Sequence, residues 1–284
     1  NAEGKMDQVA KSPSYTTTLR WRKAENFKET KRDWESFWSF YWLYKDFPTH
    51  ESAENFIYAA FSSSNGVKYR EKAIELGEEY LAKEAWKQFR ADVTFILADA
   101  YRTDAKAQDA LAKSLDGAIS TKDRDMAQKA KQKADEYYER FFDLCDRFLE
   151  AMPEHEYSRD FINMMGSVYF GRKKFNDLLS KFAGFENGAM NTAKGYVNNP
   201  KFNNSPAMSP AHYYSGLALL ATGKFEEAKP LLGAVVGANV SGLPVRDPAL
   251  DGLDPREDDE PDSTSPVQEE NGTVNESASP EELP

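Results

Sequence analysis

The strongest constraint on the fold is a helix-turn-helix pattern late in the sequence. Apolar side chains recur at helical spacing over residues 210–222, and again over residues 224–237. Gly223-Lys-Phe lies at the junction of these two patterns. A glycine at this point can take the left-handed backbone conformation that ends a helix. The segment therefore predicts two helices joined by a tight turn.

A second copy of this pattern covers residues 161–182. Lys173 stands where Gly223 stands in the first copy, and Leu178 stands where Ala228 stands. The residues at matching offsets are Gly166, Tyr169, Phe175, Leu178 and Phe182. Two weaker copies can be fitted, one around Ala98, Tyr101 and Ala110 and the other around Tyr69, Ala73 and Tyr80.

These units resemble the tetratricopeptide repeat (TPR) over roughly residues 50–238. The resemblance implies that two helices cross at Gly216, that Leu219 packs between them and that Ala228 allows their close approach. It implies an all-α fold, an α-solenoid of antiparallel helix pairs stacked into a right-handed superhelix with a concave groove. Proteins of this family bind extended peptides or helices in the groove and do not catalyse reactions.

The rest of the chain is divided by its composition. We expect an extended lead-in over residues 1–22 and a helical repeat domain over 23–240, which includes an aromatic helix at 23–47 and a loop-like insertion at 185–209. Further helices are predicted at residues 51–63, 67–82, 84–101, 104–118 and 122–150.

The charge of the chain is concentrated at its C-terminal end. Residues 241–284 contain 13 Asp and Glu against two Lys and Arg, while the remaining residues carry 34 of each sign. This segment, rich in Pro, Ser and Glu, predicts an acidic tail that is disordered or lies extended on another surface. A body without excess positive charge argues against a nucleic-acid partner.

The aromatic block at residues 34–47 has three interpretations. Trp34, Trp38 and Trp42 are spaced four apart and share one helix face. The helix can be buried as a cap on the first repeat, it can offer a docking face for a partner protein, or it can anchor at a membrane interface. In the last case Lys23, Lys28, Lys31 and Arg32 would meet lipid headgroups.

Residues that could carry chemistry are few. Cys145 is the only cysteine and lies in an apolar run, so we expect a buried, unreactive thiol. His50, His155 and His212 lie far apart and have no metal-ligand spacing. No nucleophile elbow, phosphate-binding loop or dinucleotide-binding fingerprint is present. We therefore expect no catalytic residues, no cofactor and no metal.

The expected function is that of a non-catalytic scaffold or adaptor that binds a protein or peptide partner. The candidate groove residues are Asn163, Ser167, Phe170, Tyr213, Tyr214 and Leu217, and Trp34, Trp38 and Trp42 form a second candidate surface. No stretch is long and apolar enough to span a membrane. The alternative is a membrane-tethered cell-envelope component of the lipoprotein or translocon-accessory type. Asn1-Ala2 resembles the remnant of a cleaved tag, so we expect an anchor or signal segment upstream and favour a periplasmic or membrane-anchored location over the cytoplasm. An enzyme on a helical scaffold has no motif in its support.

Overall fold

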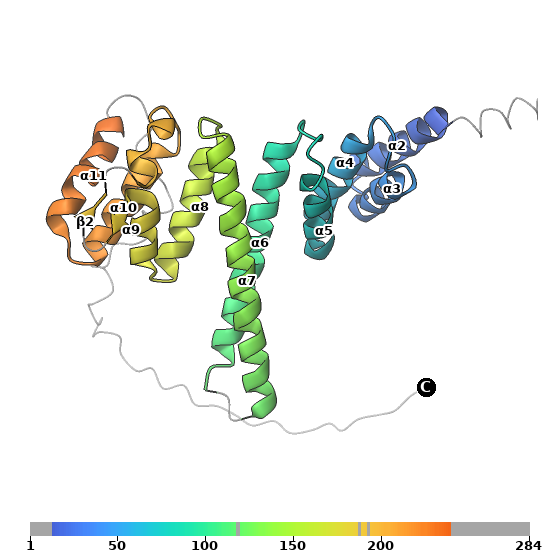
Figure 1. Ribbon diagram of the computed structural model, residues 1–284. Coiled ribbons are helices and arrows are strands. Elements are labelled where there is room, and N and C mark those ends of the chain that lie inside the picture. Colours follow the sequence, from blue (N-terminus) through green and yellow to red (C-terminus); the bar gives the residue numbers. More distant parts are fainter. Residues whose placement is uncertain (1–12, 118–119, 187–188, 192–193, 240–284) are drawn as a thin grey trace, which may run out of the picture. The chain divides into compact units, whose positions relative to one another are not determined.

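The computed structural model describes residues 13–117, 120–186, 189–191 and 194–239 (Figure 1). Within these residues the chain is helical apart from one hairpin with two residues in each strand, which confirms the predicted all-α class. The predicted acidic tail, residues 241–284, lies outside the described residues.

The described part contains ten α-helices, two short 3₁₀ helices and the hairpin. Their bounds are α2 Pro13–Glu29, α3 Asp33–Asp46, α4 Ala53–Gly66, α5 Arg70–Leu81, α6 Arg90–Ser114, α7 Thr121–Ala151, α8 Tyr157–Gly171, α9 Phe175–Ala183, β1 Phe185–Glu186, β2 Ala189–Met190, η1 Tyr196–Asn198, η2 Pro200–Phe202, α10 Met208–Ala221 and α11 Phe225–Asn239.

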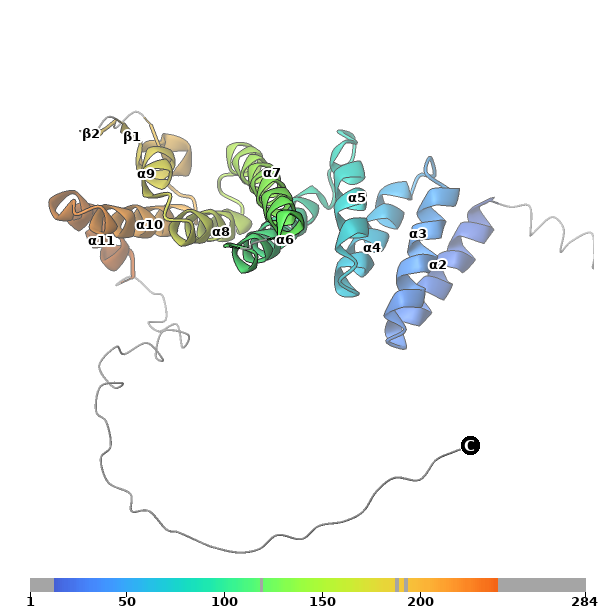
Figure 2. The ribbon, with the colours of Figure 1, turned by 90° about the horizontal axis from the view of Figure 1, so that it is seen from below.

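Helices that follow one another in the chain pack together in space. Contacts join α2 to α3, α4 to α5, α6 to α7, α8 to α9 and α10 to α11, and each pair also touches the next, so the colours in Figures 1 and 2 run in sequence order. Two apolar cores result. One holds side chains from α2 to the start of α6, the other holds side chains from α6 to α11, and Leu81 packs against both.

The same turn ends the first helix of four pairs. Lys31, Lys68, Lys173 and Gly223 have φ values of 57°, 60°, 55° and 76°, in the left-handed region. The next residue donates its N–H to the carbonyl five residues earlier, the pattern of a Schellman motif. These bonds are Arg32 to Phe27, Tyr69 to Ser64, Lys174 to Tyr169 and Lys224 to Leu219, at 2.8–2.9 Å. Lysine therefore occupies a position that favours glycine in three of the four turns.

Two of the helix pairs place one small and one large residue at their crossing. At Gly216 on α10 a Cβ atom would lie 2.5 Å from the Leu232 side chain on α11. The α4–α5 pair reverses the arrangement, because the large residue is Phe61 on the first helix and a Cβ on Gly77 of the second would lie 2.9 Å from it. In both pairs the two positions are 16 residues apart. The structure is thus compatible with a helical repeat.

Several predicted boundaries are wrong. The helix expected over residues 23–47 is two helices, α2 and α3, separated by the turn at Lys31. Residues 13–22 were predicted as an extended lead-in but belong to α2. The helices expected at 84–101 and 104–118 form one helix, α6, which begins only at Arg90. The turn at Lys31 contains no Gly or Pro to mark the break between α2 and α3, and no Gly or Pro lies at residues 101–104 to cause the break that was expected in α6.

Candidate functional site

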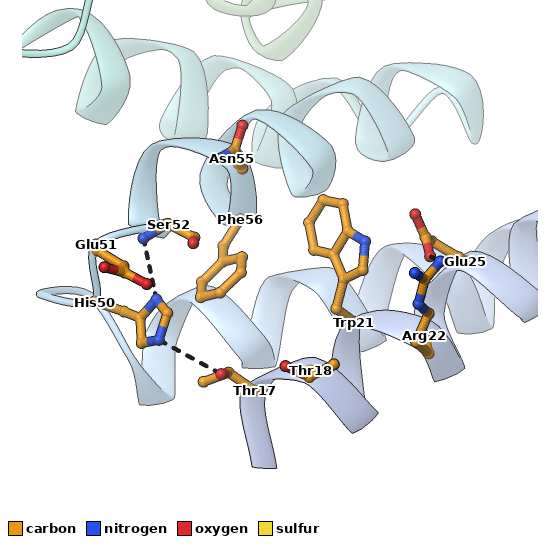
Figure 3. A pocket seen from close by; sticks show the side chains of 10 residues that line it. All are labelled: Thr17, Thr18, Trp21, Arg22, Glu25, His50, Glu51, Ser52, Asn55 and Phe56. Carbon is orange, nitrogen blue, oxygen red and sulfur yellow. Dashed lines mark hydrogen bonds and ion pairs between the residues drawn. The ribbon is translucent and has the colours of Figure 1, made fainter. Parts of the chain in front are cut away.

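A groove runs between α2 and α4, the first helices of the first two pairs. Two hollows of about 390 Å³ each lie in it, and they share Trp21, Glu25 and Asn55 in their linings. Figure 3 shows the first hollow, where Trp21 from α2 and Phe56 from α4 point into the space between the helices. The shared lining makes the two hollows one continuous groove, which we call the α2–α4 groove.

Aromatic rings form the apolar part of the α2–α4 groove. The Trp21 ring lies 4.9 Å from Phe40 and 5.8 Å from Phe56, measured between ring centroids. Further along the groove, Tyr58 stacks on Phe89 with centroids 3.9 Å apart and planes 3° from parallel. Trp21 is only half-buried, so one part of its ring packs in the core while another part stays accessible to a ligand.

His50 lies at the end of the groove where α4 begins. The Ser52 backbone N–H donates to Nδ1 of His50 at 3.0 Å, so that nitrogen must be unprotonated. The proton of the neutral ring then lies on Nε2, which is 3.5 Å from Oγ1 of the buried Thr17 and can donate to it. His50 therefore joins α2 to the start of α4 and has a structural role.

Asn55 is one of the polar groups in the groove with open bonding capacity. Its side chain is half-buried and has no hydrogen-bond partner among the described residues. A carboxamide offers one acceptor and two donor hydrogens, which match the C=O and N–H of a peptide bond. The nearby Arg22–Glu25 ion pair, at 3.0 Å, is solvent-exposed, and exposed pairs of this kind contribute little to stability.

A carboxylate connects the first helices of three successive pairs. Asp92 on α6 accepts hydrogen bonds from Tyr58 on α4 at 3.3 Å and from Tyr157 on α8 at 2.8 Å. The hydrogen bond to Asp92 raises the pKa of the Tyr157 hydroxyl to about 12, with burial adding to the effect. Phe95 also stacks on Tyr157, with ring centroids 4.7 Å apart. These contacts hold the first helices in place next to the groove.

The six candidate groove residues lie on α8 and α10, which pack against each other. Ser167 and Tyr213 are exposed, and the other four are half-buried. Phe170 packs against Phe175, with ring centroids 5.1 Å apart. Tyr214 lies over Gly166, where a Cβ would come within 2.4 Å of its ring, so Tyr214 also has a packing role. The two hollows of the α2–α4 groove are lined by other residues, which sequence reasoning missed because residues 1–22 were expected to be extended.

The three candidate tryptophans lie on one exposed face of α3. Trp34, Trp38 and Trp42 are 50%, 37% and 55% exposed, while the opposite face of the helix is buried through residues such as Phe37 and Phe40. Trp38 and Trp42 stack with ring centroids 6.5 Å apart. We call these three side chains the tryptophan ridge. The helix thus combines the two predicted roles, because one face caps the first pairs and the other is open.

Groups with potential for chemistry are sparse in the described part of the chain. No cluster of three or more His, Cys, Asp or Glu there is arranged to hold a metal ion. Burial raises the pKa of the Cys145 thiol, in agreement with the predicted unreactive cysteine. No described helix is long and apolar enough to cross a membrane.

Four of the pairs share the same left-handed turn, and the α2–α4 groove and the tryptophan ridge are two accessible surfaces of the described residues. Comparison with protein-family models, with curated proteins and with solved structures finds no match to it.

Proposed function

We propose that this protein is a non-catalytic scaffold of the tetratricopeptide type, which binds an extended peptide segment of a partner protein in the α2–α4 groove. The observation that carries the proposal is the open Asn55 carboxamide beside the accessible ring of Trp21. The repeated turns at Lys31, Lys68, Lys173 and Gly223 support the repeat assignment.

An extended peptide has two needs that the groove meets. Its backbone C=O and N–H groups leave water on binding and require partners, which Asn55 supplies as both acceptor and donor. Its apolar side chains require a dry surface, which Trp21, Phe56 and Tyr58 supply. The links from Asp92 to Tyr58 and Tyr157 hold the groove in shape before binding, which reduces the entropy lost on association.

The test begins with peptides selected from a random phage-displayed library on the full chain. Selected peptides are then measured by fluorescence anisotropy against the wild type, Asn55→Ala and Asn26→Ala. Asn26 is the matched control, because it is an exposed asparagine on α2 that does not line the groove. We expect Asn55→Ala to weaken binding by about tenfold, the equivalent of roughly 1.4 kcal/mol for lost hydrogen bonds, and Asn26→Ala to leave it unchanged.

Equal affinity of both variants for every selected peptide would remove the α2–α4 groove as the binding site. An Asn163→Ala variant extends the measurement to the candidate residues on α8 and α10. If Asn163→Ala weakens binding while Asn55→Ala does not, the peptide binds along the C-terminal pairs, as first expected. If no peptide can be selected at all, the scaffold proposal fails.

A further inference from the structure

The tryptophan ridge is the most unusual surface among the described residues. Its rings stand at every fourth position of α3, so each is turned by about 40° from the one before it and all three share one face of the helix. The ridge covers the nine residues from Trp34 to Trp42, a rise of roughly 12 Å along the helix. All three side chains are exposed, so a surface that lies along this face of α3 can contact them.

Three lysines lie near the ridge. Lys31 precedes it in the turn before α3, and Lys68 adjoins Tyr69, whose ring lies 5.7 Å from Trp34. Lys23, on α2, lines a hollow together with Trp38 and Trp42 of α3. None of these three lysines forms an ion pair with another described residue.

Two of the carboxylates near the ridge are held in ion pairs. Arg32 pairs with Glu35 at 2.8 Å, and Arg20 pairs with Asp46 at the other end of α3. Asp33, in the first turn of α3, has no ion pair among the described residues, and neither do Glu29 before the Lys31 turn and Glu71 after Tyr69. In the hollow beside Trp38 and Trp42, Arg20 pairs with Asp46, so Lys23 is the unpaired charge of the lining.

A shallow hollow lies directly beside the rings. It has a volume of about 370 Å³ and is lined by Trp38, Trp42, Lys23 and Arg20, together with Asp46. An apolar wall next to a lysine fits a lipid headgroup region, where acyl chains and phosphate groups are both within reach. Tryptophan is also a residue that concentrates at the boundary between water and lipid.

We propose that the tryptophan ridge binds the interface of an anionic lipid bilayer, with Trp34, Trp38 and Trp42 inserted at headgroup depth and Lys23, Lys31 and Lys68 paired with lipid phosphates. The helix lies on the membrane and does not span it. This contact is independent of peptide binding in the α2–α4 groove, which lies on the other side of α2 from the hollow. The bilayer is favoured over a protein partner by the three exposed tryptophans on one helix face and by the unpaired Lys23 in the hollow beside them.

The test uses the full chain with vesicles of phosphatidylcholine alone or mixed equally with phosphatidylglycerol. Flotation measures the bound fraction, and brominated lipid reports whether tryptophan fluorescence is quenched at the bilayer surface. We expect binding and quenching with the anionic vesicles and weak binding with phosphatidylcholine. Raising the salt concentration should weaken the anionic binding, because it depends on charge.

Two sets of variants assign the binding to the ridge. Trp34→Ala with Trp42→Ala should lower partitioning at least tenfold and remove most of the quenching. Lys23→Gln, Lys31→Gln and Lys68→Gln should each lower it by about fivefold, as expected for one lysine near an anionic surface. The matched controls are Lys173→Gln, at the same left-handed turn position of another pair, and Phe225→Ala, an exposed ring on α11. Both controls should bind as the wild type does.

Three results would overturn the proposal. One is the absence of binding and quenching when the wild type is mixed with anionic vesicles. This result does not depend on whether any variant folds. Another is equal binding of the ridge variants and the controls. The third is a concentration-dependent dimer, seen by sedimentation, that the tryptophan variants abolish while vesicle binding is absent, since the ridge would then be covered by a second copy of the chain.

Discussion

Two glycine-to-alanine changes on one helix pair should shift stability by clearly different amounts. Gly216 lies on α10, where an added Cβ would come within 2.5 Å of Cγ and Cδ2 of Leu232. Gly233 lies within α11, and no atom lies within 4 Å of the position its Cβ would take. Both changes replace glycine by the best helix former, but only one of them creates a clash.

The magnitudes follow from two opposing effects. Alanine stabilises a helix interior by about 0.8–1.0 kcal/mol relative to glycine. Overpacking a well-filled site costs about 1–3 kcal/mol. We therefore expect Gly233→Ala to stabilise the protein by up to about 1 kcal/mol, and Gly216→Ala to be about 1–3 kcal/mol less stable than Gly233→Ala.

Urea unfolding followed by far-ultraviolet circular dichroism measures both free energies of unfolding. A Leu232→Ala change made in the wild type and in Gly216→Ala completes a double-mutant cycle. Because Leu232→Ala removes the atoms that clash, the cycle should show a coupling of at least about 1 kcal/mol between the two sites. If Gly216→Ala and Gly233→Ala shift the unfolding midpoint equally and the cycle shows no coupling, the proposed tight crossing at Gly216 is wrong.

Two further predictions concern the turns and the interhelical hydrogen bonds. Lys173→Gly should stabilise the protein by about 0.5–1 kcal/mol in the same urea assay, because the strain of a lysine in the left-handed conformation exceeds the entropy cost of a glycine. An unchanged or lower urea midpoint of unfolding would contradict this. Burial alone would raise the pKa of the Glu79 carboxyl, but hydrogen bonds from Lys45 and Tyr44 outweigh it and hold the pKa below its usual value of 4.5. The resulting stabilisation is present above pH 4.5 and is lost as the pH falls below it. The wild type should therefore lose more stability than Glu79→Gln between about pH 5 and about pH 3, as measured by urea unfolding at each pH. Parallel curves for the two proteins would show that Glu79 is not responsible.

Local sequence signals predicted the C-terminal pairs well. Gly216 and Gly223 were expected at a crossing and at a left-handed turn, and both are found there. The Lys173 turn also matches its copy in geometry. These features depend on residues close in sequence, which explains why a pattern could reveal them. The long helix expected at residues 122–150 likewise appears as α7.

The N-terminal pairs were less predictable because their repeat residues have exchanged places. Phe61 and Gly77 reverse the small and large residues of the Gly216–Leu232 crossing, so the α4–α5 copy does not match residue by residue. The turn at Lys31 carries no glycine, and the break between α2 and α3 was therefore missed. Without α2 as a helix, the groove between α2 and α4 could not be anticipated.

The sequence by itself determined the all-α class, the pairing of the C-terminal helices and the shared face of Trp34, Trp38 and Trp42, because these follow from the spacing of apolar residues and from backbone preferences at single positions. Only the tertiary structure decided which face of α3 is buried and that Asn55 stands without a partner beside Trp21. An aromatic helix can bury either side, and the choice depends on the shape and volume of its neighbours. Those neighbours are brought together by packing across the whole N-terminal core, which no local pattern encodes.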